Sequence, residues 1–273
     1  ASVFLMEWNS FIDSLNEKGL SDSMIFMIGT AGVHIVTFWG FNLFLFACYS
    51  WNWFPKQRIQ GGEMPSKELV QSCILNRIMF HFVLQPILLL YLYPFFVWCG
   101  VSLRGPIPHM TIWIRDFGVA NMCTITLFYW IHRAMHHKWI YRYVHKQHHN
   151  FNVSIGIASE HAHPIEDIVA NYFPTLSGCL LMGSHAVVLW AWIAFRLVET
   201  IDSHSGYHFE WSLFNRMFAA KGAMRHDYHH SHNKGCYGAF IWDRFMGTDL
   251  DFLEYEKSLK PHLGEMQEKK KTL

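Results

Sequence analysis

The chain has 273 residues, of which 51% are hydrophobic and only 16% charged, and its net charge is +1. Soluble domains carry about 25% charged residues, so this balance indicates that much of the surface faces lipid. The small net charge and the lack of a basic tract with interleaved aromatic residues argue against a nucleic-acid partner. The six cysteines form no CxxC pair and fall mostly in apolar runs, so we expect packed thiols.

The first part of the chain, residues 1–131, predicts helices that cross a membrane. An amphipathic lead-in over 1–23 precedes an uncharged apolar run over 24–49, and a second apolar run covers about 78–101. A helix needs about 20 apolar residues to cross a bilayer, and both runs reach that length. A third apolar run ends at Ile131 and leads directly into the first of several histidine clusters.

Histidine is concentrated in the second half, where 15 of the 19 histidines lie between positions 132 and 232. Residues 132–137 read HRAMHH, while 145–149 and 226–230 share the spacing HxxHH. Helical positions i, i+3 and i+4 share a face, so each HxxHH presents three imidazoles together. Neutral imidazoles bind zinc, copper, iron or nickel, and these clusters hold more of them than the roughly four to six ligands of one ion. The clusters therefore predict two metal ions.

The identity of the metal stays open between zinc, copper and iron on spacing alone. The HExxH motif of zinc hydrolases does not occur, and the chain does not repeat the ExxH motif in the way that soluble di-iron bundles do. An all-histidine pair suits redox-active ions that bind O2. Asp202 and Asp227 are predicted to accept the outer N–H of ligand imidazoles, with Glu160, Glu166 and Glu199 as further candidates.

Residues 168–201 form an apolar stretch interrupted by a Gly-Ser-His turn. Its two legs of roughly 16 residues are short for full crossings, so we expect a shallow or re-entrant hairpin. Such a hairpin would return 226–230 to the membrane face that carries 132–149, and the basic loops place that face in the cytosol. Trp190 and Trp192 are expected either to line a lipid-accessible pocket or to anchor the hairpin at the membrane interface.

The predicted fold is an all-α, multi-span helical membrane protein with a cytosol-facing, histidine-rich helical cap that holds a dinuclear metal site. Membrane helices occupy 1–131, the catalytic region covers 132–250, and a polar tail covers 251–273. The final letters, KKTL, are similar to the dilysine signal for return to the endoplasmic reticulum. A solvated basic tail is the alternative interpretation.

Several segments carry a resemblance to a known family. The order HxxxHH, HxxHH, HxxHH in a multi-span chain resembles the membrane fatty acid hydroxylase superfamily, which includes sterol oxidases and desaturases. Within it, YRYVHKQHHNF, EHAHPIE, LWAWIAFRLVETIDSHSGY, HDYHH and WDRFMGTD are similar to the C-4 methylsterol monooxygenases. The similarity is strong over about 125–250 and extends to the N-terminal half mainly by layout. Arg225 and residues 124–126 depart from the pattern, because many relatives carry a histidine and an acidic residue there.

The resemblance implies two iron ions, O2, and electrons from NAD(P)H that arrive through cytochrome b5 and its reductase, because the chain has no HPGG-type haem segment. The implied reaction oxidises a sterol C-4 methyl group to alcohol, aldehyde and carboxylate at the endoplasmic reticulum membrane, alongside the other sterol C-4 demethylation enzymes. By this resemblance, nine histidines match the family's metal ligands: His132, His136, His137, His145, His148, His149, His226, His229 and His230. His204 is the best tenth candidate, and His163 is either a further ligand or the outer partner of one.

Two alternatives remain open. A hydroxylase or desaturase of another sterol or of an acyl lipid would share the same histidine clusters, and only product analysis separates it from a sterol C-4 methyl oxidase. A membrane metal-binding or transport protein belongs to a different class. Such a protein would be expected to carry its ligands inside the spans, whereas the clusters here follow the span ends.

Overall fold

The computed structural model describes residues 2–216 and 221–258, and the regular elements in this part of the chain are all helical. The all-α prediction is therefore confirmed. The dilysine-like ending at 270–273 lies outside the described residues. The elements are α1 (Ser2–Glu17), α2 (Asp22–Ser50), η1 (Pro55–Gln57), α3 (Lys67–Met79), η2 (Phe80–Leu84), α4 (Gln85–Trp98), α5 (Met110–Met135), α6 (Lys138–Tyr141), η3 (His145–Asn150), η4 (Gly156–Glu160), α7 (Pro164–Glu166), η5 (Asp167–Tyr172), α8 (Phe173–Met182), α9 (Ala186–Ser203), α10 (Leu213–Arg216), α11 (Gly222–His232) and α12 (Phe240–Met246).

Two helices are long and apolar enough to cross a membrane, and they coincide with the first two predicted runs. One is α2, with 29 residues, and the other is the continuous helix α3–η2–α4, with 32 residues. In the most apolar 18-residue stretch of each helix, only 33% of α2 and 22% of α3–η2–α4 is buried inside the protein. A core helix of a soluble protein would be mostly buried. Phe46, Leu75 and Tyr91 are among the large apolar side chains left exposed, as expected where lipid surrounds the helix.

The third apolar run forms α5, but this helix does not pass the same test of length and hydropathy. It carries Arg115, Asp116 and Arg133 within its 26 residues. Arg115 pairs with Asp116 at 2.8 Å, and the Asp116 carboxylate also accepts a hydrogen bond from Ser184 at 2.7 Å. These contacts tie the start of α5 to the turn before α9.

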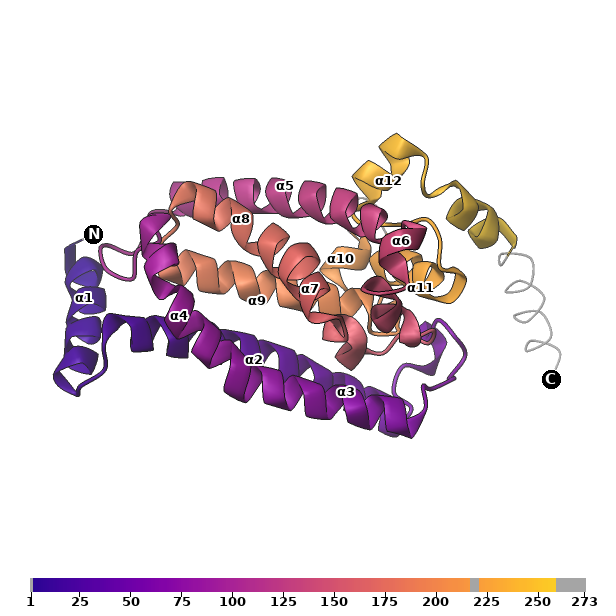
Figure 1. Ribbon diagram of the computed structural model, residues 1–273, viewed down its shortest axis with the longest axis horizontal. Helices are drawn as coiled ribbons and strands as arrows, with labels where there is room; N and C mark the ends of the chain where they lie inside the picture. The colour runs from indigo at the N-terminus through magenta and orange to yellow at the C-terminus, as the bar shows by residue number, and fades with distance from the viewer. Residues whose placement is uncertain (1, 217–220, 259–273) are drawn as a thin grey trace.

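The long helices run side by side along the longest axis of the molecule, with α11 and α12 at one end and α1 at the other (Figure 1). The hairpin of α8 and α9 packs against α5 on one side and α2 on the other. Its turn contains Gly183, whose φ of +56° ends α8 in the left-handed region. The predicted hairpin over 168–201 is thus present, and it returns the chain to the end of the bundle where α11 lies.

Both tryptophans of the hairpin pack between helices. The Trp192 ring is buried, and its indole N–H donates to the Thr175 carbonyl at 2.8 Å. The Trp190 indole N–H donates to the Thr30 hydroxyl at 2.9 Å, across the interface with α2. Indole rings prefer such places, where the ring is packed and the N–H has an acceptor.

The contact between α5 and α8 depends on a small residue. A Cβ atom on Gly178 would lie 2.3 Å from the Ala120 Cα, so the two backbones approach too closely for any side chain. We expect Gly178→Ala to lower the free energy of unfolding by about 1–3 kcal/mol, measured in detergent, because the helices must separate. The matched control is Gly118→Ala in α5, where nothing lies within 4 Å. That change should stabilise the helix by about 0.5–1 kcal/mol, and equal effects of the two substitutions would contradict the account.

The segment after α11 folds back onto it. Residues 250–258 are helical, and Phe252 packs against Tyr228 and Cys236 in a small buried cluster. The polar tail expected from 251 therefore begins as part of the folded unit. All six cysteines are free, in agreement with the prediction of packed thiols.

Candidate metal centre

Five imidazoles from three separate elements converge on one point, and we term them the first imidazole group. His132 and His136 come from the end of α5, His145 and His149 from η3, and His229 from α11. The Nε2 atom of His145 lies 3.0, 3.1 and 3.0 Å from those of His132, His136 and His149. His136 and His229 are 3.2 Å apart between the same atoms. One ligand nitrogen from each residue lies within 4.8 Å of all the others.

Four further imidazoles form the second imidazole group beside the first. They belong to His148, His204, His226 and His230. The Nε2 atoms of His204 and His148 are 3.4 Å apart, those of His226 and His204 are 2.7 Å apart, and those of His230 and His226 are 3.0 Å apart. The two groups touch where the rings of His149 and His230 stack with centroids 4.7 Å apart.

The outer ring nitrogens show which way the inner ones face. In the first group, the Nδ1 atoms of His132 and His229 each lie 2.6 Å from a backbone carbonyl. In the second, His204 Nδ1 lies 2.7 Å from the Thr200 carbonyl and His148 Nδ1 lies 3.3 Å from that of His161. A carbonyl oxygen can only accept a hydrogen bond, so Nδ1 of each of these rings carries the proton. In a neutral imidazole the other nitrogen, Nε2, then bears a lone pair.

Lone pairs that face one another at such distances cannot hydrogen bond, and they repel unless a cation lies between them. This arrangement matches metal-binding histidines, which hold their outer N–H with a carbonyl or carboxylate and aim the other nitrogen at the ion. Burial also keeps these rings neutral. It lowers the pKa of His149 to about 3, with His132 adding to the effect, and lowers that of His204 to about 4. The residues present therefore fit a pair of transition-metal ions.

A carboxylate does contact the first group, and it belongs to Glu166. Its Oε1 lies 2.7 Å from Nδ1 of His145, and both side chains are buried. Burial, with Asp167 adding to it, raises the pKa of Glu166 to about 9. A cation bound by His145 would favour the ionised carboxylate, because metal ions reverse the effect of burial on nearby acids.

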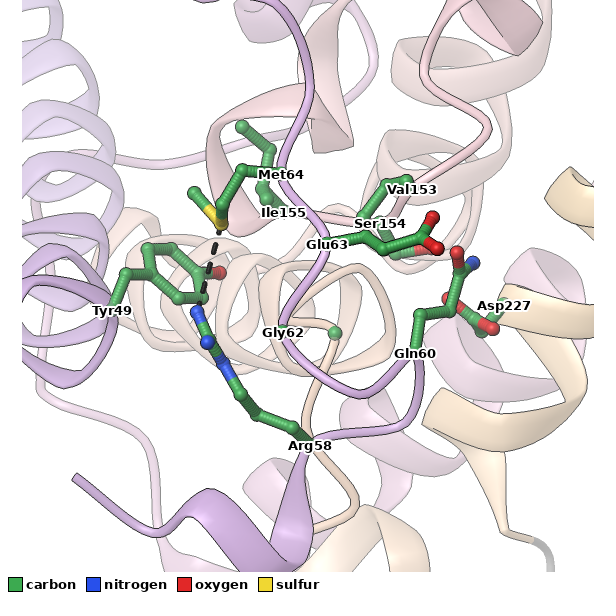
Figure 2. Close-up of a pocket in the computed structure, with 11 residues that line it drawn as sticks. Tyr49, Arg58, Gln60, Gly62, Glu63, Met64, Val153, Ser154, Ile155 and Asp227 are labelled. Carbon is green, nitrogen blue, oxygen red and sulfur yellow. Dashed lines mark hydrogen bonds between the residues drawn. The ribbon is translucent and has the colours of Figure 1, made fainter. Parts of the chain in front are cut away.

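The two carboxylates predicted as outer partners do not have that role. Asp202 accepts hydrogen bonds from Ser212 and Asn215 at 2.8 and 3.4 Å. Asp227 accepts one from the Gln60 amide at 2.9 Å, at the edge of the pocket drawn in Figure 2. Successive residues of an α-helix are rotated by 100° about its axis. Asp227 directly follows His226, and Asp202 precedes His204 by two residues, so each carboxylate points to a different side of its helix than the neighbouring histidine. The prediction was wrong for both residues.

Two predicted ligands lie outside both groups. His137 is exposed, and its Nδ1 accepts the Trp139 N–H at 3.5 Å as the N-cap of α6. His163 is half-buried, and its Nδ1 accepts the Ile165 N–H at 3.2 Å as the N-cap of α7. The helix ends at Met135, so the spacing argument does not extend to His137. Both predictions are corrected, whereas His204 does lie in the second group.

The loop between the two candidate spans contacts segments that flank the second imidazole group. Gln60 also donates to the Asn152 carbonyl at 3.0 Å, and the Ile59 N–H donates to the Gly206 carbonyl at 3.0 Å. Figure 2 shows Gln60 reaching Asp227 on α11, while Arg58 lies on the other side of the recess. This loop links the two candidate spans to the histidine region.

A turn that sequence reasoning missed holds two ligands of the first group. The carbonyls that accept from His132 and His229 belong to residues 235–237. Asp243 fixes this turn by accepting a backbone N–H at 2.9 Å, and Arg225 approaches the Asp243 carboxylate at 3.4 Å. Arg225, which departs from the family pattern, thus supports the site. Asp243 lies in the segment WDRFMGTD, whose resemblance to the family marked it in the sequence. That resemblance did not indicate that the segment supports the ligand histidines.

Together, the helical bundle and the two facing imidazole groups define a histidine-rich protein with a candidate dinuclear metal centre. The sequence model described as fatty acid hydroxylase matches residues 117–248, which include all nine histidines of the two groups. The chain belongs to the fatty acid hydroxylase family, a family of oxidoreductases.

The relatives carry several different names. Very-long-chain aldehyde decarbonylase GL1-11 of Oryza sativa subsp. japonica is 33% identical over 258 residues, covering 92% of this chain and 94% of that protein. Methylsterol monooxygenase 1 of Rattus norvegicus is 34% identical over 253 residues, covering 89% and 84%. Fatty acid hydroxylase domain-containing protein 2 of Homo sapiens is 30% identical over 256 residues, covering 90% and 72%. No solved structure gives a significant match.

Proposed function

We propose that the protein is a membrane di-iron monooxygenase that oxidises the C-4 methyl group of a sterol to alcohol, aldehyde and carboxylate. The observation that carries the proposal is the pair of imidazole groups in a chain 34% identical to rat methylsterol monooxygenase 1. The segments RLVETIDSHSGY and HDYHH, which contribute His204, His226, His229 and His230, are those that resemble the sterol oxidases.

The first imidazole group would hold one iron ion and the second the other. Iron bound there supplies the O2 chemistry that breaks an unactivated C–H bond. The chain orients the ligands through Glu166 and the carbonyls described above, and it keeps the rings neutral by burial. Burial also excludes water, which protects a strong oxidant from side reactions.

We further propose that electrons come from NAD(P)H through cytochrome b5 and its reductase, because each oxidation consumes electrons and protons as well as O2. The location would be the endoplasmic reticulum membrane, with α2 and α3–η2–α4 as spans and the histidine region on the cytosolic side. The basic loops support this orientation through the positive-inside rule. The other sterol C-4 demethylation enzymes would receive the product.

Sterol profiling of cells that lack the protein tests the substrate. We expect 4-methylated sterols to accumulate, and the wild-type chain to remove them when it is restored. The purified protein, with cytochrome b5, its reductase and NAD(P)H, should convert a 4-methylsterol to the C-4 alcohol and carboxylate. An unchanged sterol profile, together with no sterol product in vitro, would contradict the proposal.

The second candidate is an oxidase of an acyl lipid. It is favoured by the relative from Oryza sativa, whose name refers to very-long-chain aldehydes and whose length is 94% covered. The same purified system separates the two candidates when it receives a very-long-chain aldehyde or a fatty acid in place of the sterol. Turnover of the acyl lipid without turnover of the sterol would select this second function.

A further inference from the structure

A third cluster of metal-ligating side chains lies between the two candidate spans and the histidine region. His34 belongs to α2, His81 belongs to η2, and Glu160 is the last residue of η4. His34 Nε2 lies 2.8 Å from one oxygen of Glu160, and His81 Nε2 lies 2.8 Å from the other. Their ligand atoms all lie within 4.8 Å of one another, and the exposed fractions of the side chains are 5%, 0% and 12%. No residue of either imidazole group takes part.

The helix that supplies His81 departs from regular geometry at that residue. Phe80–Leu84 is a π-helical turn within the long α3–η2–α4 helix, and the Gln85 N–H bonds to the Phe80 carbonyl five residues back. Turns of this kind are rare and are frequently found at functional sites. Ionisable side chains inside membrane helices are likewise rare without a function. Both candidate spans contribute one imidazole to the same carboxylate.

The spacing of the two imidazoles equals that in the first group. The ring centroids of His34 and His81 are 4.7 Å apart, as are those of His132 and His145 and those of His136 and His229. Imidazoles that share an ion must approach one another in this way.

The outer nitrogen of His34 has a partner that suits a ligand. The side-chain amide of Gln85 lies 3.0 Å from His34 Nδ1, and its own oxygen is buried without a hydrogen bond. Turning this amide by half a rotation presents the oxygen to an Nδ1–H, which leaves the Nε2 lone pair free for an ion. The same residue can therefore support the ligand form of His34.

The charges around the cluster favour a cation. Arg77 is buried and pairs with Asp167 at 3.5 Å, so its charge is shared with a second buried carboxylate. Glu160 is left with two imidazoles, which are neutral unless they take up a proton. Burying a carboxylate without a compensating positive charge is costly, and a divalent ion supplies that charge.

We infer that His34, His81 and Glu160 form a third metal site, which takes a divalent ion of the zinc type. Two imidazoles and a carboxylate are a known zinc donor set, with the fourth position open to water. The ion would join both candidate spans to the backbone at residue 160. The carbonyl of the next residue, His161, accepts from His148 Nδ1 at 3.3 Å, so the site would help to position a ligand of the second group.

Zinc counting on the full-length protein in detergent tests this inference without any reaction. We expect three Zn2+ ions per chain after saturation with Zn2+ and dialysis, and two for Glu160→Gln. The matched control is Glu199→Gln, the same change in a carboxylate paired with Arg196, which should keep three. If His34, His81 and Glu160 only hydrogen bond to one another, the wild-type chain will saturate at two ions. That result, or three ions in Glu160→Gln, would overturn the inference.

Anomalous diffraction at the zinc edge from the wild-type protein gives a second result that does not depend on the folding of a variant. A peak is expected between His34 Nε2, His81 Nε2 and the Glu160 carboxylate. Zinc peaks at the two imidazole groups without a peak at this position would exclude the third site.

Discussion

Replacing His229 with alanine is expected to abolish oxidation while the protein still inserts into the membrane. His229 lies in the last turn of α11, its Nε2 atom is 3.2 Å from that of His136, and a backbone carbonyl accepts from its Nδ1 at 2.6 Å. Loss of an outer partner alone typically costs 10- to 100-fold in activity, so loss of a ligand should cost more than about 100-fold. Turnover of the substrate by isolated membranes measures the effect, and extraction with carbonate verifies insertion.

The matched control for this prediction is His137→Ala. His137 belongs to the first histidine cluster of the sequence, residues 132–137, but its side chain is exposed and lies outside both imidazole groups. We expect this variant to retain nearly full turnover, because it loses only a helix cap worth about 1 kcal/mol. Equal loss of activity in both variants, or full activity in His229→Ala, would contradict the assignment of the first imidazole group.

Removal of the Glu166 carboxylate is expected to weaken metal binding by about 10- to 100-fold. In Glu166→Ala the Nδ1–H of His145 loses its acceptor at 2.7 Å inside a buried site, so the ring is free to turn away from the ion. Glu166→Gln should retain much of the affinity, because the amide oxygen can still accept. Titration of the metal-free protein with Co2+, followed by its visible absorption, gives the affinities.

Asp227→Asn separates this effect from a general loss of buried charge. Asp227 is buried like Glu166, but it bonds to Gln60 and reaches no imidazole, and asparagine keeps an oxygen for that bond. Its Co2+ affinity should stay within about threefold of the wild type, a change of under 1 kcal/mol. A loss in Asp227→Asn as large as in Glu166→Ala would show that the carboxylate on His145 has no specific role.

Much of the site follows from the histidine clusters, because each HxxHH brings its three imidazoles to the centre, although residues 145–150 form a 3-10 helix and not the expected α-helix. The two HxxHH clusters supply six of the nine convergent imidazoles, and each cluster contributes to both groups. Spacing failed at His137, where a helix ends within the cluster. His204 has no cluster around it, so only the family resemblance pointed to it.

The outer contacts could not be predicted, because they depend on backbone atoms brought from distant parts of the chain. The carbonyl that holds His132 comes from a turn 105 residues later. His34 and Glu160 lie 126 residues apart, and a single histidine in an apolar run carries no spacing signal. Such contacts are set by the packing of α2, α5 and the hairpin rather than by any local pattern.

Iron-edge anomalous diffraction from the iron-loaded protein tests the central claim most directly. We expect one peak between the Nε2 atoms of the first imidazole group, around His145, and one between those of the second, around His204. The position of each peak is independent of the substrate and of the electron donor. A single peak for both groups, or no peak at either, would contradict a dinuclear centre.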